Sequence, residues 1–179
     1  MTSTLQVQNL QGPTSGSNTN QVLLGSGQKI IATDQGSLVA PGMVMQVIQN
    51  TSNNAVNTSS NNFLNTGFAV TITPKLSTSK ILLTVNVFLT ILNGGQASLS
   101  LYSNADSAFV TSLSMGFGGI YDGGGSTVES IQSISFLTDV VGSTNSRTYS
   151  LYGKSTVNDP VYFLNSTRLS TFTAMEIAQ

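Results

Sequence analysis

The sequence predicts an all-β protein, with a jelly-roll-like antiparallel β-sandwich head that follows an extended N-terminal arm. First, apolar and polar residues alternate with a period of two in several segments, and no window sustains a 3.6-residue period. Second, clusters of Gly, Asn, Asp and Pro separate these segments at short intervals. Third, only 7% of the 179 residues are charged, against about a quarter in typical domains. Ser, Thr, Asn, Gln and Gly take their place, and these residues favour strands and turns over helices.

Residues 1–42 differ from the rest of the chain. Short apolar segments such as Val22-Leu23-Leu24 alternate with turn clusters such as Gly12-Pro13, and each segment is too short to bury a core alone. Such an arm is either flexible or ordered by wrapping around copies of itself, and we favour the second interpretation. The predicted domains are therefore an attachment and intertwining arm at 1–42 and a head at 43–179.

Within the head we expect nine strands and one long polar loop at 50–62. The expected strands are residues 43–49, 68–73, 80–92, 97–102, 108–115, 128–139, 147–153, 161–164 and 168–178. In 80–92, one face is wholly apolar and the other is mixed. This pattern is typical of a sandwich strand whose second face is partly covered, here by a neighbouring subunit.

The joint before that strand, residues 72–80, contains Lys75 and Lys80, two of the six cationic residues of the chain. The pair could form an anion site. However, Pro74 cannot donate to a strand ladder and favours a strand end, and lysines at strand ends protect edges against unwanted pairing. We therefore interpret this joint as a strand–turn–strand connection.

Several classes of function are disfavoured by composition. The chain has no histidine and no cysteine, so a conventional Ser-His-Asp triad, a thiolate nucleophile and a Cys-type zinc site are absent. Its net charge of −1 offers no positive field for nucleic acid. The apolar run 81–92 is too short to span a bilayer, and the N-terminus does not resemble a secretory signal. We expect no enzymatic activity, no cofactor, no metal, no nucleic-acid binding and no membrane insertion.

The carboxylates give no catalytic pattern. Glycoside hydrolysis needs two of them about 5–10 Å apart, and no sequence spacing places any two together. Those in turn clusters, such as Asp34, Asp106 and Asp159, are explained by Asx turns.

The Gly-rich stretch 115–126 is the candidate contact loop. Phe117, Tyr121 and Asp122 could stack on and hydrogen-bond a sugar or another host surface group. The alternative, which we favour, is that the glycines supply positive φ angles in a long hairpin tip.

Four segments resemble a family of small tail-fibre-like or virion surface proteins of tailed bacteriophages, often aquatic phages. They are "LQVQNLQGPTSGSNTNQVLLGSGQKI", "APGMVMQVIQ", "TGFAVTITPKLSTSKILLTV" and "LSTFTAMEIAQ". The motifs span both ends and about half of the chain, and each is short and built from common residues. The resemblance implies a trimeric β-rich head on a thin, intertwined N-terminal segment.

From the resemblance we expect a bacteriophage virion structural protein: a tail-fibre-like homotrimer, made in the host bacterial cytoplasm and located on the particle surface. Its arm would bind other virion proteins of the tail or capsid, and its head would contact a host glycan or protein. The alternative is a decoration protein that stabilises the capsid, which the compact length keeps open. A polysaccharide depolymerase is the least favoured function.

Overall fold

The computed structural model describes residues 10–17, 19, 21–31, 38–92, 94–121, 123–164 and 166–179. The chain divides into two units, Met1–Ser37 and Leu38–Gln179. The described residues of the first unit form no helix and no strand, and residues 21–31 are all exposed. Residues 38–42 group with the second unit, where the Gly42 N–H donates to the Ala178 carbonyl (2.8 Å) and the Ala178 N–H donates to the Met43 carbonyl (2.9 Å).

The described residues of the second unit form strands, turns and loops and no helix, which confirms the all-β fold class. The strands are β1 (Val44–Ser52), β2 (Val56–Thr58), β3 (Leu64–Ile72), β4 (Lys80–Ile91), β5 (Gln96–Ser103), β6 (Ala108–Phe109), β7 (Gly119–Tyr121), β8 (Val128–Leu137), β9 (Arg147–Ser155), β10 (Val161–Phe163) and β11 (Ser170–Ile177).

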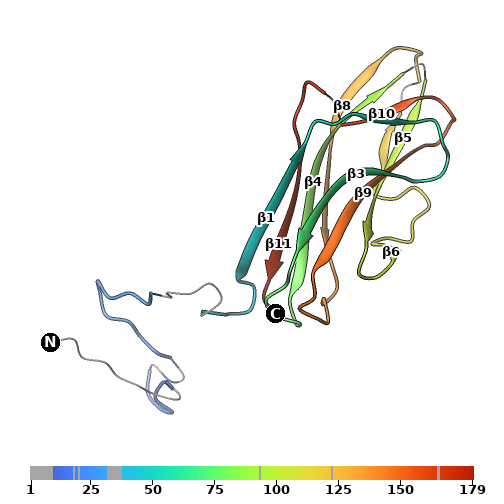
Figure 1. Cartoon of the computed structure of the whole chain (residues 1–179). Coiled ribbons are helices and arrows are strands. Elements are labelled where there is room, and N and C mark those ends of the chain that lie inside the picture. Colours follow the sequence, from blue (N-terminus) through green and yellow to red (C-terminus); the bar gives the residue numbers. More distant parts are fainter. Residues whose placement is uncertain are drawn as a thin grey trace. The chain divides into compact units, whose positions relative to one another are not determined.

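The strands pair antiparallel in two sheets (Figure 1). In sheet I, β1 pairs with β11, β11 with β4, and β4 with β8; the short strands β10 and β2 extend the sheet beside β4. In sheet II, β3 pairs with β9 and β9 with β5, whose other edge pairs with β6 and β7. Without the short strands β2, β6 and β10, eight strands remain. Sheet I then has the order β1-β11-β4-β8, which in chain order are strands one, eight, three and six of the eight. Sheet II has the order β3-β9-β5-β7, which are strands two, seven, four and five. This order is that of a jelly roll.

Two expectations for individual elements were wrong. A strand was expected over 108–115, but β6 ends at Phe109 because the chain turns away after Val110 and returns to the β5 edge near Phe117. The loop expected over 50–62 is shorter, because β1 continues to Ser52 and β2 occupies Val56–Thr58. Backbone pairing decides both cases. In 50–62, polar side chains on exposed strands hide the pairing from a hydrophobicity pattern, and in 108–115 an alternating pattern is present but β6 ends at Phe109.

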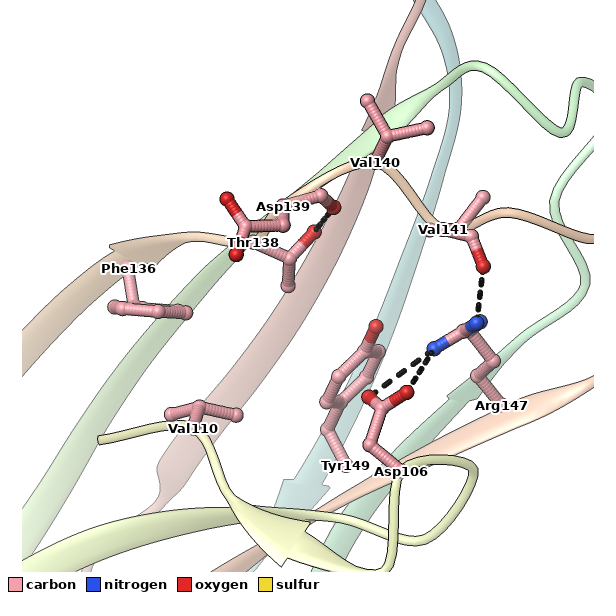
Figure 2. Close-up of a pocket in the computed structure, with 9 residues that line it drawn as sticks. All are labelled: Asp106, Val110, Phe136, Thr138, Asp139, Val140, Val141, Arg147 and Tyr149. Atoms are coloured by element: carbon pink, nitrogen blue, oxygen red, sulfur yellow. Dashed lines mark hydrogen bonds and ion pairs between the residues drawn. The ribbon is translucent and has the colours of Figure 1, made fainter. Parts of the chain in front are cut away.

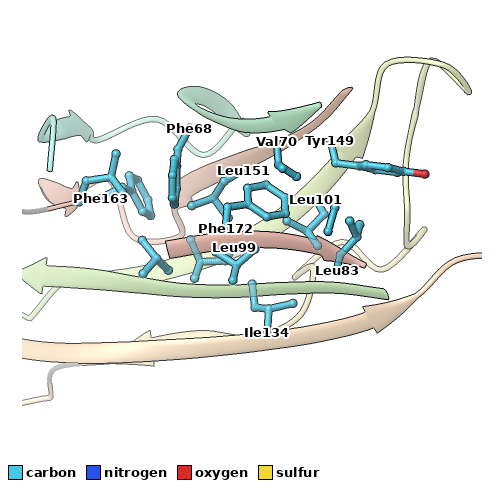
Figure 3. Close-up of a cluster of buried hydrophobic side chains, with 14 of the residues drawn as sticks. Phe68, Val70, Leu83, Leu99, Leu101, Ile134, Tyr149, Leu151, Phe163 and Phe172 are labelled. Atoms are coloured by element: carbon cyan, nitrogen blue, oxygen red, sulfur yellow. The ribbon is translucent and has the colours of Figure 1, made fainter. Parts of the chain in front are cut away.

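The core lies between the sheets (Figure 3). Every second residue of β4, from Ile81 to Ile91, is completely buried, whereas Leu82, Thr84, Asn86 and Thr90 are half-buried. The predicted two-faced character of this strand is therefore confirmed. The rings of Phe68 from sheet II and Phe172 from sheet I meet edge to face, with centroids 5.8 Å apart. Such contacts add to the free energy gained from burying apolar surface.

The joint between β3 and β4 is organised by a buried carboxylate, that of Glu176 on β11. Its oxygens accept hydrogen bonds from the N–H groups of Lys75 (2.8 and 2.9 Å) and Leu76 (3.0 Å) and from the Gln46 amide (2.6 Å). Burial by itself raises the pKa of Glu176, but the bonds from Lys75, Gln46 and Leu76 together lower it below its ordinary value. The strand–turn–strand joint is thus tied to the last strand of the chain.

Candidate functional site

A pocket of about 230 Å³ opens between the two sheets (Figure 2). Sheet I contributes the end of β8 and the loop after it, and sheet II contributes the β5–β6 turn and the start of β9. Its lining residues are Asp106, Val110, Phe136, Thr138, Asp139, Val140, Val141, Arg147 and Tyr149. The pocket therefore combines an apolar wall with two carboxylates, one guanidinium and one phenol.

Arg147 is the electrostatic centre of this pocket. Its Nη1 donates to both carboxylate oxygens of Asp106 (3.2 Å each), and its Nη2 donates to the Val141 carbonyl. The Arg147 side chain is only 11% exposed, whereas that of Asp106 is 57% exposed. The Ser103 hydroxyl also donates to Asp106 (2.5 Å). The guanidinium therefore holds the β5–β6 turn and the loop after β8 to the start of β9.

Tyr149 lies beside this ion pair with its ring buried. Burial raises the pKa of its phenol, and the neighbouring Arg147 offsets only part of that rise, so the group is protonated near neutral pH. Asp139 is exposed at the pocket and forms no ion pair within the described part of the chain. Asp106 is thus paired with Arg147, and Asp139 faces solvent. The ion pair joins two loops. The residues that line the pocket include no nucleophile in contact with a base.

No sequence pattern predicted that Asp106 and Asp139 line one pocket, or that Asp106 pairs with Arg147. The partners of that pair are 41 residues apart, and strand order alone brings them together. No local pattern encodes such a contact.

The structure separates the residues expected in a host-contact loop. Phe117 is half-buried and packs on Phe136, with ring centroids 5.4 Å apart. Tyr121, the last residue of β7, is 64% exposed. Asp122 lies outside the described residues. Of the two described aromatic rings, only that of Tyr121 is largely open to solvent.

The glycines before Tyr121 serve strand pairing. The backbone of 116–119 runs against β5, where the Phe117 N–H donates to the Leu99 carbonyl (2.8 Å) and the Leu99 N–H donates to the Gly118 carbonyl (3.0 Å). A Cβ on Gly116 or Gly119 would overlap a carbonyl of β5, and Gly116 has a positive φ of 63°. Much of the Gly-rich stretch is therefore an edge of sheet II, and its glycines permit this close approach.

The outer face of sheet I carries a second candidate surface. Cross-strand partners form an apolar row from Val47 through Met175 and Leu82 to Leu137. Val44 and Ile177 form a pair in the neighbouring row. Val44, Val47 and Leu137 are 48%, 53% and 48% exposed, and the other three are half-buried. We call these six residues the apolar band.

On one side of the band lie two rows that are polar and uncharged, whereas on the other side the row of Val44 and Ile177 continues to Lys80 on β4. Gln49, Thr173, Thr84 and Ser135 form one row, and Thr51, Thr171, Asn86 and Ser133 form the next. Hydrogen bonds link side chains within them, including Ser133 to Asn86 (2.6 Å) and Gln49 to Thr173 (3.0 Å). Eight neighbouring positions thus carry no charge that would oppose contact with another uncharged surface.

Within the described ranges, no three acidic side chains gather into a group that could hold a metal ion. Among the same residues, no helical segment has the length and hydropathy needed to traverse a bilayer.

No family model and no curated protein matches the sequence. Among solved structures, the chain is similar to chains in structures of infectious bursal disease virus and of particles derived from it. The crystal structure of the VP2 subviral particle has 14% identity and a TM-score of 0.41, covering 93% of this chain and 45% of that chain. The virus-derived T=1 particles have 14% identity and a TM-score of 0.38, covering 91% and 42%. The Gx strain structure has 13% identity and a TM-score of 0.36, covering 90% and 44%.

The chain spans less than half the length of each of these three structures. At such scores the likeness carries no argument about function or assembly.

Proposed function

We propose that this chain is a non-enzymatic structural protein of a bacteriophage virion, a tail-fibre-like homotrimer whose β-rich head is exposed on the particle surface. The sequence resemblance described above supports the virion setting. The jelly-roll head and the separate N-terminal segment agree with the architecture that the resemblance implies.

The observation that carries the proposal is the apolar band. Three of its members are about half exposed, and all six lie on one sheet face, where two neighbouring rows are uncharged and Lys80 is the charged partner of Ile177. Exposed apolar surface that spans several strands marks a contact with another macromolecule. Because the two polar rows carry no charge, self-association over the band and these rows buries apolar surface without opposing like charges there.

The described N-terminal residues point the same way. Six large apolar side chains there are between 49% and 77% exposed: Leu10, Val22, Leu23, Leu24, Ile30 and Ile31. A soluble monomer gains nothing from this exposure, whereas strands or loops contributed by several copies can cover it. The segment is therefore suited to wrap around copies of itself and to bind other virion proteins.

Two measurements test the proposal. Native mass spectrometry of the full chain should give three copies, and a monomer at micromolar concentration would refute the trimer. Electron microscopy of particles labelled with an antibody to this protein should place the label at the tail. A label distributed over the capsid would replace the fibre with a decoration protein, and its absence from particles would refute the virion assignment.

The compact head also supports the alternative function, that of a decoration protein on the capsid. It predicts that particles lacking the protein lose heat resistance while they still adsorb to cells. A fibre predicts the opposite pair of results, so one deletion strain distinguishes the two functions.

A further inference from the structure

A shallow groove of about 460 Å³ lies on the outer side of sheet II, away from the pocket of Figure 2. It is formed by the segment before β3, by β6 and the residues after it, and by β9. Its lining residues are Asn61, Asn62, Phe63, Ala108, Phe109, Thr111, Ser112, Leu113, Ser114 and Lys154. This volume falls within the roughly 300–1,000 Å³ of typical small-ligand sites.

The floor of the groove is aromatic and held in place. The ring of Phe109 lies 5.2 Å from that of Phe63, 5.4 Å from that of Tyr102 and 5.2 Å from that of Tyr152, measured between centroids. Three neighbouring rings thus fix the orientation of Phe109, which remains 37% exposed. A rigid, partly exposed ring is a stacking surface that loses little conformational entropy when a ligand binds.

The rim of the groove is polar. Thr111, Ser112 and Ser114 offer hydroxyl groups, and the side-chain amides of Asn61 and Asn62 make no hydrogen bond within the described part of the chain. Amides and hydroxyls both donate and accept hydrogen bonds. They therefore match a ligand that is itself rich in hydroxyl groups.

The groove carries one charge, and it is positive. Lys154 Nζ lies 4.8 Å from the centroid of the Phe63 ring and donates to the Ser114 carbonyl (2.7 Å). No carboxylate lines the groove, and Lys154 forms no ion pair with a described residue. The lysine is therefore available to a ligand anion.

We propose that this groove binds an acidic saccharide, a sugar unit that bears a carboxylate. The apolar face of the sugar ring stacks on Phe109 and Phe63, its hydroxyl groups bond to the polar rim, and its carboxylate pairs with Lys154. The inference rests on the proposed function only for the origin of the sugar, a host surface polysaccharide.

The test is to titrate the full chain with digalacturonate, and separately with the neutral disaccharide maltose, and to measure binding by NMR and calorimetry. Digalacturonate should bind, and maltose should bind about tenfold more weakly because it lacks the partner of Lys154. Raising the salt concentration from about 0.05 M to 0.5 M should weaken only the acidic ligand.

Matched variants locate the site. Lys154→Met keeps the aliphatic stem over Phe63 and should abolish the preference for the acidic sugar, whereas Lys75→Met, at an exposed lysine outside the groove, should not. Ser112→Trp should fill the groove and eliminate binding. Ser126→Trp, in an exposed loop elsewhere, should have no effect.

Several results would overturn the inference: no binding of digalacturonate at about 50 mM, unchanged binding in Ser112→Trp, or loss of binding in Tyr121→Ala. Release of new reducing ends from oligogalacturonate would replace binding with hydrolysis and would also refute the non-enzymatic function. If the protein is a trimer and is located on the particle but binds no sugar, only the proposal for the groove is refuted. If the protein is a monomer and is absent from particles but binds the sugar, only the proposed virion function is refuted.

Discussion

The two outer faces of the head are built from similar alternating strands, yet they differ in what they expose. The outer face of sheet I exposes aliphatic side chains in the apolar band, next to rows of Thr, Ser, Asn and Gln. The outer face of sheet II carries rings that contact one another, a lysine and a groove. A smooth aliphatic band suits a repeated protein surface, and a hollow with oriented polar groups suits a small ligand.

The difference shows that alternation alone decides which residues face out, while the type of outward residue decides the use of a face. We propose self-association through the outer face of sheet I and sugar binding on the outer face of sheet II. Changes on one face should therefore leave the function of the other intact.

The largest expected effect comes from placing charge within the apolar band. Val47→Glu with Leu137→Glu would bury unpaired carboxylates in a subunit contact, so association should weaken at least about a hundredfold. Size-exclusion chromatography with light scattering should then give a monomer that still binds sugar. Thr51→Glu, on the same strand and face but in a polar row, is the control that should keep the oligomer. An unchanged mass for the double variant would remove the band from the interface.

A smaller effect is expected from Glu176, which ties the last strand of sheet I to the joint between the sheets. Glu176→Gln replaces a buried acceptor of several hydrogen bonds with an amide, and should lower the free energy of unfolding by about 1–3 kcal/mol. Urea denaturation measures this change. Since neither Glu176 nor its partners Lys75, Leu76 and Gln46 line the groove, a variant that remains folded should keep its sugar affinity.

The pH dependence of the wild-type protein sharpens that prediction. The pKa of Glu176 is lower in the folded state than its ordinary value of 4.5. The carboxylate therefore stabilises the fold above pH 4.5, and this contribution is lost as the pH falls through the lower folded-state pKa. Denaturation at a series of pH values should show a steeper loss for wild type than for Glu176→Gln. Parallel curves would contradict the assignment.

The smallest effect is expected at the pocket between the faces. Asp106 is more than half exposed, so Asp106→Asn should change the free energy of unfolding by less than about 1 kcal/mol, as for other solvent-screened ion pairs. Neither oligomer mass nor sugar binding should change. A loss above about 3 kcal/mol would instead show that the largely buried Arg147 requires its partner.

The sequence predicts those features that depend on neighbouring residues. Alternation correctly identifies the buried and outward faces of β4, and Pro74 correctly marks the end of β3. β2 and β7 are missed because they lie in stretches rich in Asn and Gly, which indicate loops, and both strands form by pairing with distant partners.

The candidate surfaces were harder to predict for the same reason. Phe63, Phe109 and Lys154 come from three separate elements, and the apolar band draws on four strands. Each residue alone looks like an ordinary strand or loop residue. Only the order of strands in the sheets, which no local pattern encodes, brings them together.

The hydrogen bonds between Gly42, Met43 and Ala178 also determine how the head would carry a mechanical load. Tension applied along the entering chain reaches β1 first, and β1 is joined to β11 by a ladder that extends from Val44 to Ser52. When the pull is parallel to the strand, the bonds of that ladder are sheared together and share the force. A load applied at this end would therefore act on the head through one of its longest strand pairings.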